Sequence, residues 1–227
     1  MLHMSGEMTK AMENHASGCC INIGTLESIA VSILPEILTG YSDKHPKVSV
    51  QIENGPTFGP NGLVERVLGH SCDLAFVSGD VEHPDIRKWV IGEDHVVIVT
   101  NKDCGETIDF KKLLQILSFP TGCVCRILYD RFAEHIGVKS KQVLESSSLS
   151  TIFSNVVAGM GVACFPKSCI SFYKTRFPVY SYELPEPYTR MEWSLICRKD
   201  TYLTKPMKEL IREAQRGKPY IDGVAAK

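Results

Sequence analysis

Short apolar strands alternate with amphipathic helices along this chain, and this alternation limits its fold more than any other feature of the sequence. Residues 48–52 alternate apolar and polar side chains with the period of a strand, whereas Ile29, Ile33 and Ile37 recur every four residues, as on one face of a helix. Residues 73–77 are almost entirely apolar, as expected of a strand in a parallel sheet covered on both faces. The pattern therefore predicts an α/β protein.

The alternation starts afresh near Thr100, which predicts two lobes and not one long sheet. A chain of 227 residues is long enough for one large domain or two small ones. Pro35 interrupts the first helix and is expected to kink it. The periodicities predict helices at 29–41, 61–69, 109–114, 125–136, 149–158 and 203–214, and strands at 21–23, 48–52, 73–77, 96–100, 116–119, 142–144, 161–165, 179–184 and 193–198.

The charges of the chain are balanced: 25 Lys and Arg face 26 Asp and Glu, for a formal net charge of -1. A nucleic-acid-binding module usually carries a concentrated basic face. We therefore do not expect these residues to bind DNA by themselves.

The nine cysteines are scattered, and their number is odd. Several lie in apolar runs, such as Cys164 within Gly-Val-Ala-Cys-Phe, which indicates reduced thiols that pack as small hydrophobic side chains. No CxxC pair or Cys/His spacing typical of zinc ligands occurs. The sequence therefore predicts neither a metal site nor a cofactor.

The first 17 residues carry charges and lack the apolar segment of a secretory signal. No apolar run approaches the roughly 20 residues needed to span a bilayer. We therefore expect a cytoplasmic protein with no membrane partner. Residues 1–17 place three methionines on one helical stripe and are expected to be the end of a linker helix or an appended tail.

Five groups of residues follow one another in a characteristic order. They are Ile23-Gly24-Thr25 with Ile33-Leu34-Pro35, Tyr41 and His45-Pro46; Val67-Leu68-Gly69 with residues 72–77; Thr121-Gly122-Cys123 through Arg126; residues 157–166; and residues 197–204. In this order and spacing they resemble the effector-binding domain of LysR-type bacterial transcription regulators. Each group alone is weak, but the combination covers residues 18–216 and is fairly specific.

The resemblance implies two Rossmann-like lobes joined by two crossover strands, similar to type 2 periplasmic binding proteins. By analogy, the first lobe comprises residues 18–100 and 195–227 and the second comprises residues 101–194. The resemblance also implies that a small-molecule effector binds between the lobes and modulates transcription. Further implications are self-association as a homodimer or homotetramer, and DNA binding only through a helix-turn-helix head in a longer parent protein.

Ligands of open α/β sheets bind outside the carboxyl ends of the strands, where helix N-termini point. Three such places carry hydroxyls or free backbone amides, and together they suit a small anion such as a carboxylate, because helix N-termini carry partial positive charge. The candidates there are Thr25, Ser28, Cys123, Cys125, Ser146, Ser147 and Ser148. A hydroxyl before a helix is also an ordinary N-cap, so the structural role stays open for each.

Two further residues are candidates for ligand contact. Arg126, in the first turn of its helix, can offer a bidentate partner to a carboxylate, with a surface salt bridge as the alternative. Thr57 lies in the Gly55-Pro56-Thr57 loop after the second strand. The thiols of Cys123 and Cys125, at a helix N-terminus near Arg126, also favour a thiol-based redox-sensing regulator as an alternative function.

Two other function classes compete with a sensing domain. A solute-binding protein of a transporter shares the two-lobed plan, but the absence of a signal and the nine cysteines argue against export. An enzyme is disfavoured because no GxSxG, HExxH or Walker motif occurs and the seven histidines lie apart in sequence. We therefore expect no catalytic residues.

Overall fold

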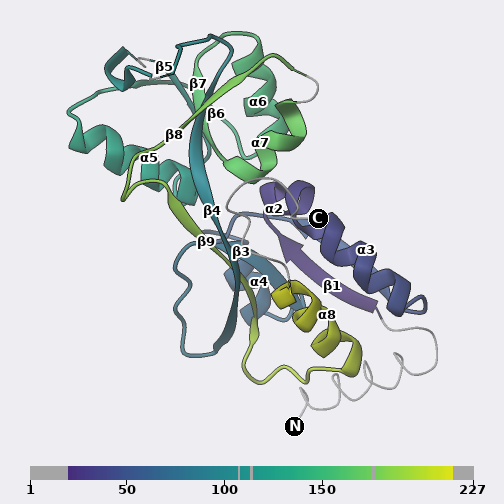
Figure 1. The fold of residues 1–227 in the computed structure, drawn as a ribbon. Helices are drawn as coiled ribbons and strands as arrows, with labels where there is room; N and C mark the ends of the chain where they lie inside the picture. Colours follow the sequence, from purple (N-terminus) through teal and green to yellow (C-terminus); the bar gives the residue numbers. More distant parts are fainter. Residues whose placement is uncertain (1–19, 107, 113–114, 175–176, 217–227) are drawn as a thin grey trace.

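The computed structural model describes residues 20–106, 108–112, 115–174 and 177–216. Within these residues, nine strands form one mixed sheet in the order β2-β1-β3-β9-β4-β7-β5-β6, with β8 paired to β4. Figure 1 shows two lobes joined by β4 (Ile86–Thr100) and β9 (Arg190–Arg198). The predicted α/β fold with two Rossmann-like lobes is confirmed. The predicted helix end at residues 1–17 lies outside the described residues.

Lobe I is built on three parallel strands, with β1 (Cys20–Thr25) between β2 (Ser49–Asn54) and β3 (Leu74–Ser78). Its helices are α2 (Glu27–Ser32), α3 (Leu34–Lys44), α4 (Leu63–Leu68) and α8 (Lys205–Arg216). Successive side chains of β3 enter two different cores: Leu74 and Phe76 pack in one, Ala75 and Val77 in the other. Since both faces of β3 are covered, its residues 74–77 are all apolar.

Lobe II repeats the plan around β5 (Gln115–Ser118), which pairs in parallel with β6 (Lys141–Glu145) and β7 (Val162–Pro166). The strand β8 (Tyr180–Glu183) lies antiparallel to the end of β4. The helices are α5 (Val124–His135), α6 (Leu149–Val157) and α7 (Lys167–Lys174), with a 3₁₀ turn, η1 (Phe110–Lys112). One core cluster packs α6 and α7 against β7, with Phe153 and Phe165 at its centre.

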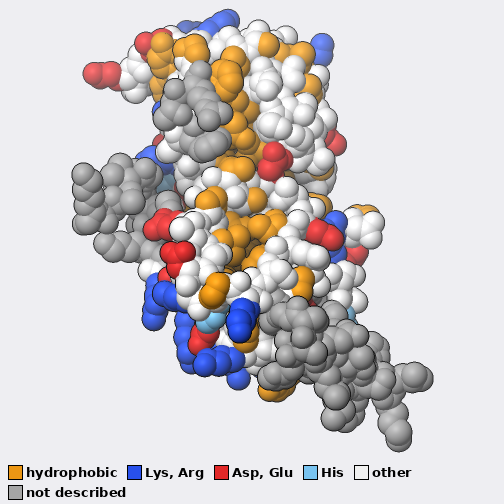
Figure 2. Space-filling view, turned by 90° about the vertical axis from the view of Figure 1, so that its right-hand side faces the viewer, with side chains coloured by type: hydrophobic (Ala, Val, Ile, Leu, Met, Phe, Trp, Pro, Cys, Tyr) orange, Lys and Arg blue, Asp and Glu red, His pale blue; other side chains and the backbone are white. Residues whose placement is uncertain are grey.

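The two crossover strands hold the lobes together as a continuous antiparallel pair. Their ladder runs from Ile86 opposite Arg198 to His95 opposite Arg190, and residues 96–100 of β4 then pair with β7 and β8 in lobe II. Trp193 and Val96 belong to one core cluster that contains side chains from both lobes. The residue bounds given above for the two lobes stay a prediction. Figure 2 shows the lobes one above the other, with hydrophobic side chains reaching the surface along the middle of this face.

The predicted kink at Pro35 is confirmed as a break between two helices. The first helix ends at Ser32, the second begins at Leu34, and Pro35 lies in the first turn of the second. Proline fits there because the amide of that position has no helical acceptor. The helix predicted at 109–114 is shorter, a single 3₁₀ turn at Phe110–Lys112 among the described residues.

Helix α7 was not expected from the sequence, because Pro166 ends the preceding strand and itself stands immediately before the helix, where a capping side chain would be expected. The cap comes from far along the chain: the buried carboxylate of Asp94 accepts hydrogen bonds from the backbone N–H of Ser168, at 3.3 Å, and from its hydroxyl, at 2.7 Å. A helix N-terminus satisfied by a residue of another element has no local signal.

Candidate functional site

A pocket of about 460 Å³ lies between the two lobes. The carboxyl ends of β1, β2 and β3 supply one wall, and the start of α5 with the loops after β5 and β6 supplies the other. This is the edge at which parallel α/β sheets bind ligands, because helix N-termini point there. The lining residues are Leu26, Glu27, Ser28, Asn54, Gly55, Pro56, Thr57, Phe58, Gly59, Pro60, Asn61, Arg66, Ser78, Phe119, Pro120, Thr121, Cys123, Val124, Cys125, Ser147, Leu149, Pro166 and Met191.

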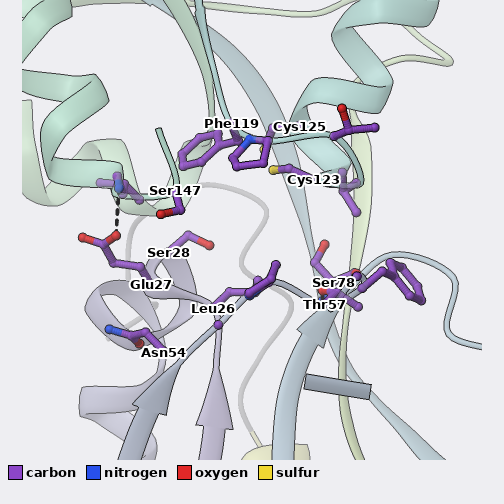
Figure 3. Close-up of a pocket in the computed structure, with 18 of the residues that line it drawn as sticks. Leu26, Glu27, Ser28, Asn54, Thr57, Ser78, Phe119, Cys123, Cys125 and Ser147 are labelled. Atoms are coloured by element: carbon purple, nitrogen blue, oxygen red, sulfur yellow. Dashed lines mark hydrogen bonds between the residues drawn. The ribbon is translucent and has the colours of Figure 1, made fainter. Parts of the chain in front are cut away.

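Figure 3 shows how the two lobes face each other across this pocket. Ser28 and Glu27 rise from the start of α2, and Thr57 and Ser78 lie beside each other at the end of β3. Phe119 and Cys123 come from lobe II on the opposite side. Residues more than 90 positions apart in sequence therefore share one cavity.

Five of the nine residues predicted to contact a ligand line the pocket: Ser28, Thr57, Cys123, Cys125 and Ser147. Ser147 is exposed and Ser28 is half-buried, so their hydroxyls are accessible from the cavity. Thr57 is buried, and its hydroxyl donates to the carbonyl of Ser78 at 3.1 Å. This bond fixes the 55–61 loop against β3.

The other four predicted residues lie outside the lining. Thr25 is fully buried, and its hydroxyl donates to the carbonyl of Leu26 at 3.2 Å. Ser148 is the N-cap of α6 and accepts from the amide of Thr151, while the hydroxyl of Ser146 accepts from the amide of Ser148. The hydroxyls of Thr25, Ser146 and Ser148 therefore make local contacts with the backbone, which is the structural role that the sequence left open for them.

The guanidinium of Arg126 is also engaged within lobe II. It pairs with Glu145 at 2.6 Å and with Asp130 at 3.4 Å, and it donates to the carbonyl of Phe119 at 3.0 Å. These partners raise the pKa of Arg126, although its partial burial opposes them, and the same ion pair lowers the pKa of Glu145. Arg126 therefore supports the wall of the pocket from behind through Phe119.

Two polar groups of the pocket were missed from the sequence. Ser78 is buried, and its hydroxyl has no hydrogen-bond partner among the described residues. It directly follows the strand predicted at residues 73–77, so the rule that ligands bind at the carboxyl ends of strands could have identified it. Glu27 accepts a hydrogen bond from the amide of Leu149 at 2.7 Å. This contact joins the two lobes, and no local sequence pattern predicts it.

The charged groups in the lining are Glu27 and Arg66, and both are already paired. The guanidinium of Arg66 contacts Glu53 at 3.2 Å and donates to the carbonyl of Asn61 at 2.8 Å. The rest of the lining is apolar or neutral, with Leu26, Phe119 and Met191 among the apolar side chains. A ligand would therefore contact a mainly apolar surface with a few neutral hydrogen-bond donors.

The thiols of Cys123 and Cys125 form a pair at the start of α5. Hydrogen bonding with Cys125 lowers the pKa of Cys123, and the backbone N–H groups of Arg126 and Cys125 and the guanidinium charge act in the same direction against the effect of burial. The pKa of Cys125 is raised, by its bond to Cys123 and by burial. The eight cysteines among the described residues are free thiols.

Within the described part of the chain, no group of three or more His, Cys, Asp or Glu side chains is placed to hold a metal ion. Over the same residues, no helix is both long and apolar enough to cross a membrane.

Comparison with known proteins places the chain in a family. Residues 20–218 match the sequence profile described as the LysR substrate binding domain. The chain is 32% identical over 215 residues to the HTH-type transcriptional regulator SoxR of Arthrobacter sp. (strain TE1826), covering 93% of this chain and 71% of that protein. It is also 32% identical over 191 residues to the HTH-type transcriptional regulator YofA of Bacillus velezensis, covering 84% of this chain and 65% of that protein. The chain thus spans about two thirds of the length of these relatives.

Solved structures share the fold at low sequence identity. The effector binding domain of QuiR in complex with shikimate superposes with a TM-score of 0.75 at 18% identity, covering 88% of this chain and 97% of that one. The regulatory domain of CcmR from Synechocystis PCC6803 in complex with 2-PG gives a TM-score of 0.76 at 16% identity, covering 87% of this chain and 96% of that one. The chain therefore belongs to the LysR substrate binding domain family, the effector-binding part of LysR-type transcription regulators.

Proposed function

We propose that this domain binds a small acidic metabolite between its lobes and that binding alters their relative orientation. The observation that carries the proposal is the pocket itself, since its walls come from both lobes and its volume of about 460 Å³ lies within the range of small-molecule sites. A ligand that contacts both walls favours one arrangement of the lobes over others, which is the differential binding that a switch requires.

The lining suits an apolar body with one acidic group. The hydroxyls of Ser28 and Ser147 and the side chain of Asn54 are neutral groups that can donate to a carboxylate. The cavity surface around them is largely apolar, which favours a compact organic acid over an inorganic ion. Two of the solved structures that share this fold are in complex with small molecules, shikimate and 2-PG, which supports a small-molecule effector here.

In the full-length regulator, the lobe rearrangement would be passed to DNA-binding heads in a homodimer or homotetramer in the bacterial cytoplasm. The coupling needed is modest, typically 1–3 kcal/mol between two sites. A catalytic role is not proposed. The described lining contains one carboxylate, Glu27, which already accepts the amide of Leu149, and it contains no histidine.

The test is a thermal-shift screen of small organic acids, each paired with its neutral amide. A ligand at 100 times its Kd is expected to stabilise the domain by about 2.7 kcal/mol. The Ser147→Phe variant, which places a ring over the pocket from an exposed position, is expected to lose that stabilisation. The matched control is Ser171→Phe, an exposed position on α7 outside the lining. Stabilisation by amides but not acids would overturn the acidic ligand, and stabilisation unaffected by Ser147→Phe would overturn the site.

A further inference from the structure

Two cysteines of one short motif, Cys123-Val124-Cys125, lie together on the lobe II wall of the pocket. Cys123 is the N-cap residue of α5, with extended backbone angles, and Cys125 lies within the first turn of the helix. Figure 3 shows the sulfur of Cys123 directed into the pocket, across from Ser78 and Thr57. A small molecule that enters the cavity therefore meets this thiol.

The surroundings of Cys123 favour its ionised form. Its sulfur interacts with the thiol of Cys125 and with the backbone N–H groups of Cys125 and Arg126, and the guanidinium of Arg126 lies close enough to attract a negative charge. These groups lower the pKa of Cys123. Because the thiolate is the nucleophile, a cysteine in such surroundings reacts faster at neutral pH than an ordinary one.

The neighbouring Cys125 differs from Cys123 both in its exposure to the cavity and in the direction of its pKa shift. It is buried, with 3% of its surface exposed, and it lies near two other buried cysteines, Cys164 and Cys169. Its pKa is raised, so it stays protonated and is shielded from reagents in solution. Yet it contacts the sulfur of Cys123 directly. An accessible nucleophile with a protected thiol at hand is the arrangement that a two-step oxidation requires.

A second polar group points to an occupant of this part of the pocket. Ser78 belongs to the lining of the pocket, and its buried hydroxyl has no hydrogen-bond partner among the described residues. Buried polar groups are normally paired, so this hydroxyl is available to a small polar molecule positioned between it and lobe II.

We propose that Cys123 is a nucleophilic thiol that reacts with hydroperoxides entering the pocket, and that Cys125 converts the product into an intrachain disulfide. In the first step the Cys123 thiolate attacks the peroxide O–O bond, giving a sulfenic acid on Cys123 and releasing the alkoxide or hydroxide, which takes up a proton. In the second step the alkoxide or hydroxide released by the first step takes the proton of Cys125, and the resulting Cys125 thiolate attacks the sulfenic sulfur. The disulfide forms as the S–O bond breaks, and the hydroxide that leaves takes up a proton to become water. Two electrons pass from the two thiols to the peroxide.

The spacing of the two cysteines permits the bridge. With one residue between them, their Cα atoms are at most about 7 Å apart, close to the upper end of the range that disulfides span. Drawing the two sulfurs to about 2.05 Å would pull the Cys123 side chain from the cavity toward the helix. The oxidised and reduced domains would therefore present different pocket walls. This change in the pocket wall rests on the proposed effector site, whereas the formation of the disulfide does not.

The experiment treats the reduced protein with one equivalent of hydrogen peroxide and maps every cysteine by peptide mass spectrometry. A disulfide between Cys123 and Cys125 is expected, seen as the loss of two hydrogens from the peptide that contains both. The Cys125→Ser variant should instead accumulate a sulfenic acid at Cys123 that dimedone traps. The Cys123→Ser variant should leave Cys125 unmodified.

Cys104 is the matched control, because it is the exposed cysteine among the described residues. Alkylation of the untreated wild-type protein with iodoacetamide compares the rates at which Cys123 and Cys104 react. Because this comparison needs no variant, it remains valid if one of the variants fails to fold. We expect Cys123 to react faster than Cys104, by about threefold for each unit by which the pKa of Cys123 is lowered. Each unit of lowered pKa gives tenfold more thiolate, and roughly half of that logarithmic gain is offset by weaker nucleophilicity.

Faster modification of Cys104 than of Cys123, or peroxide treatment that yields no Cys123–Cys125 disulfide, would overturn the proposal. Effector binding by Cys123→Ser in the thermal-shift screen is a separate readout. If the variant still binds acids while the wild type forms no disulfide, the redox proposal fails and the sensing function stands. If the disulfide forms in a protein that no acid stabilises, the redox proposal stands and the sensing function fails.

Discussion

The carboxylate of Glu27, at the start of α2 in lobe I, accepts a hydrogen bond from the backbone amide of Leu149, at the start of α6 in lobe II, at 2.7 Å. One lobe thereby caps a helix of the other. Figure 3 shows this bond at the margin of the pocket. The amide it satisfies is one of those that a helix N-terminus leaves without an intrahelical partner.

The Glu27→Ala substitution is expected to loosen this contact between the lobes. Hydrogen bonds to charged groups contribute about 1.5–3 kcal/mol, and because Glu27 is only half-buried we expect the low end, a loss of about 1.5 kcal/mol in the free energy of unfolding. Urea denaturation measures this loss, and hydrogen exchange should show faster exchange at the Leu149 amide. Glu134→Ala, at an exposed position of α5, is the control. Unchanged exchange at Leu149 would show that the capping bond does not form in solution.

Asp94 is expected to make stability depend on pH in a particular window. Burial raises the pKa of this carboxyl from 3.8 to about 6, against the hydrogen bonds from Ser168 and the amide of His95 that lower it. The folded state therefore holds its proton where the unfolded state has lost it. This contribution to stability is full below about pH 4, declines as the pH rises to about 6, and amounts to about 3 kcal/mol at most.

The Asp94→Asn variant isolates this effect, because its side chain does not titrate. The stability difference between wild type and variant, measured by urea denaturation from pH 4 to pH 7, should move in favour of the variant as the pH rises. Carboxyls with lowered pKa, such as Glu145 and Glu213, give the opposite slope but are common to both proteins. A difference that stays constant over this range would contradict the assignment to Asp94.

Ser78→Ala is expected to separate binding from folding. The hydroxyl of Ser78 is buried without a partner among the described residues, so its removal should leave the free energy of unfolding unchanged or slightly higher. The same change should weaken binding of the acid identified by the thermal-shift screen. Isothermal titration calorimetry measures the binding, and a loss in affinity of about fivefold corresponds to one ordinary hydrogen bond of about 1 kcal/mol.

The neighbouring Thr57→Val is the matched variant for Ser78→Ala. The hydroxyl of Thr57 donates to the carbonyl of Ser78, so its loss leaves a buried acceptor unpaired and should destabilise the fold by about 1–3 kcal/mol. If Ser78→Ala destabilised the protein as much as Thr57→Val, the Ser78 hydroxyl would have a structural partner, and its role in the pocket would be refuted.

Gly79→Ala is expected to push the lobes apart. A Cβ atom at Gly79 would lie 2.7 Å from Cγ2 of Val124 in lobe II, and the backbone φ of +93° is itself unfavourable for alanine. Together these effects should cost about 2–4 kcal/mol. Gly105→Ala has a similar φ of +77° with open space around it, so it measures the backbone effect alone. The double variant Gly79→Ala with Val124→Ala should recover part of the loss, and equal losses for the two single variants would rule out the steric contact.

The elements that local periodicity determines were predicted well. The amphipathic pattern of Met207, Leu210, Ile211 and Ala214 gave the last helix, and all four side chains are buried. By contrast, the first ten residues of β4 were missed, because charged and apolar side chains mix there without alternation. Their strand conformation comes from the long pairing with β9, which joins residues about 100 positions apart.

The pocket was predicted in location but only partly in its residues. Helix N-termini and strand ends led to Ser28, Thr57, Cys123, Cys125 and Ser147, since these places follow from topology. The same rule also selected Thr25 and Ser148, which are used in local backbone contacts. The sequence does not distinguish a capping hydroxyl from one that faces a cavity, because that choice depends on how the second lobe docks.

The ladder between β4 and β9 has a consequence for how such domains change over time. The chain leaves lobe I along β4 and returns along β9, and His95 and Arg190 are directly opposed in that ladder. Facing residues of antiparallel strands lie about 4.5–5.5 Å apart, so the intervening segment begins and ends at one point. A whole lobe can thus be exchanged between relatives as a single insert without any new linker. Half of the pocket between the lobes would travel with it, while the other half stays in place.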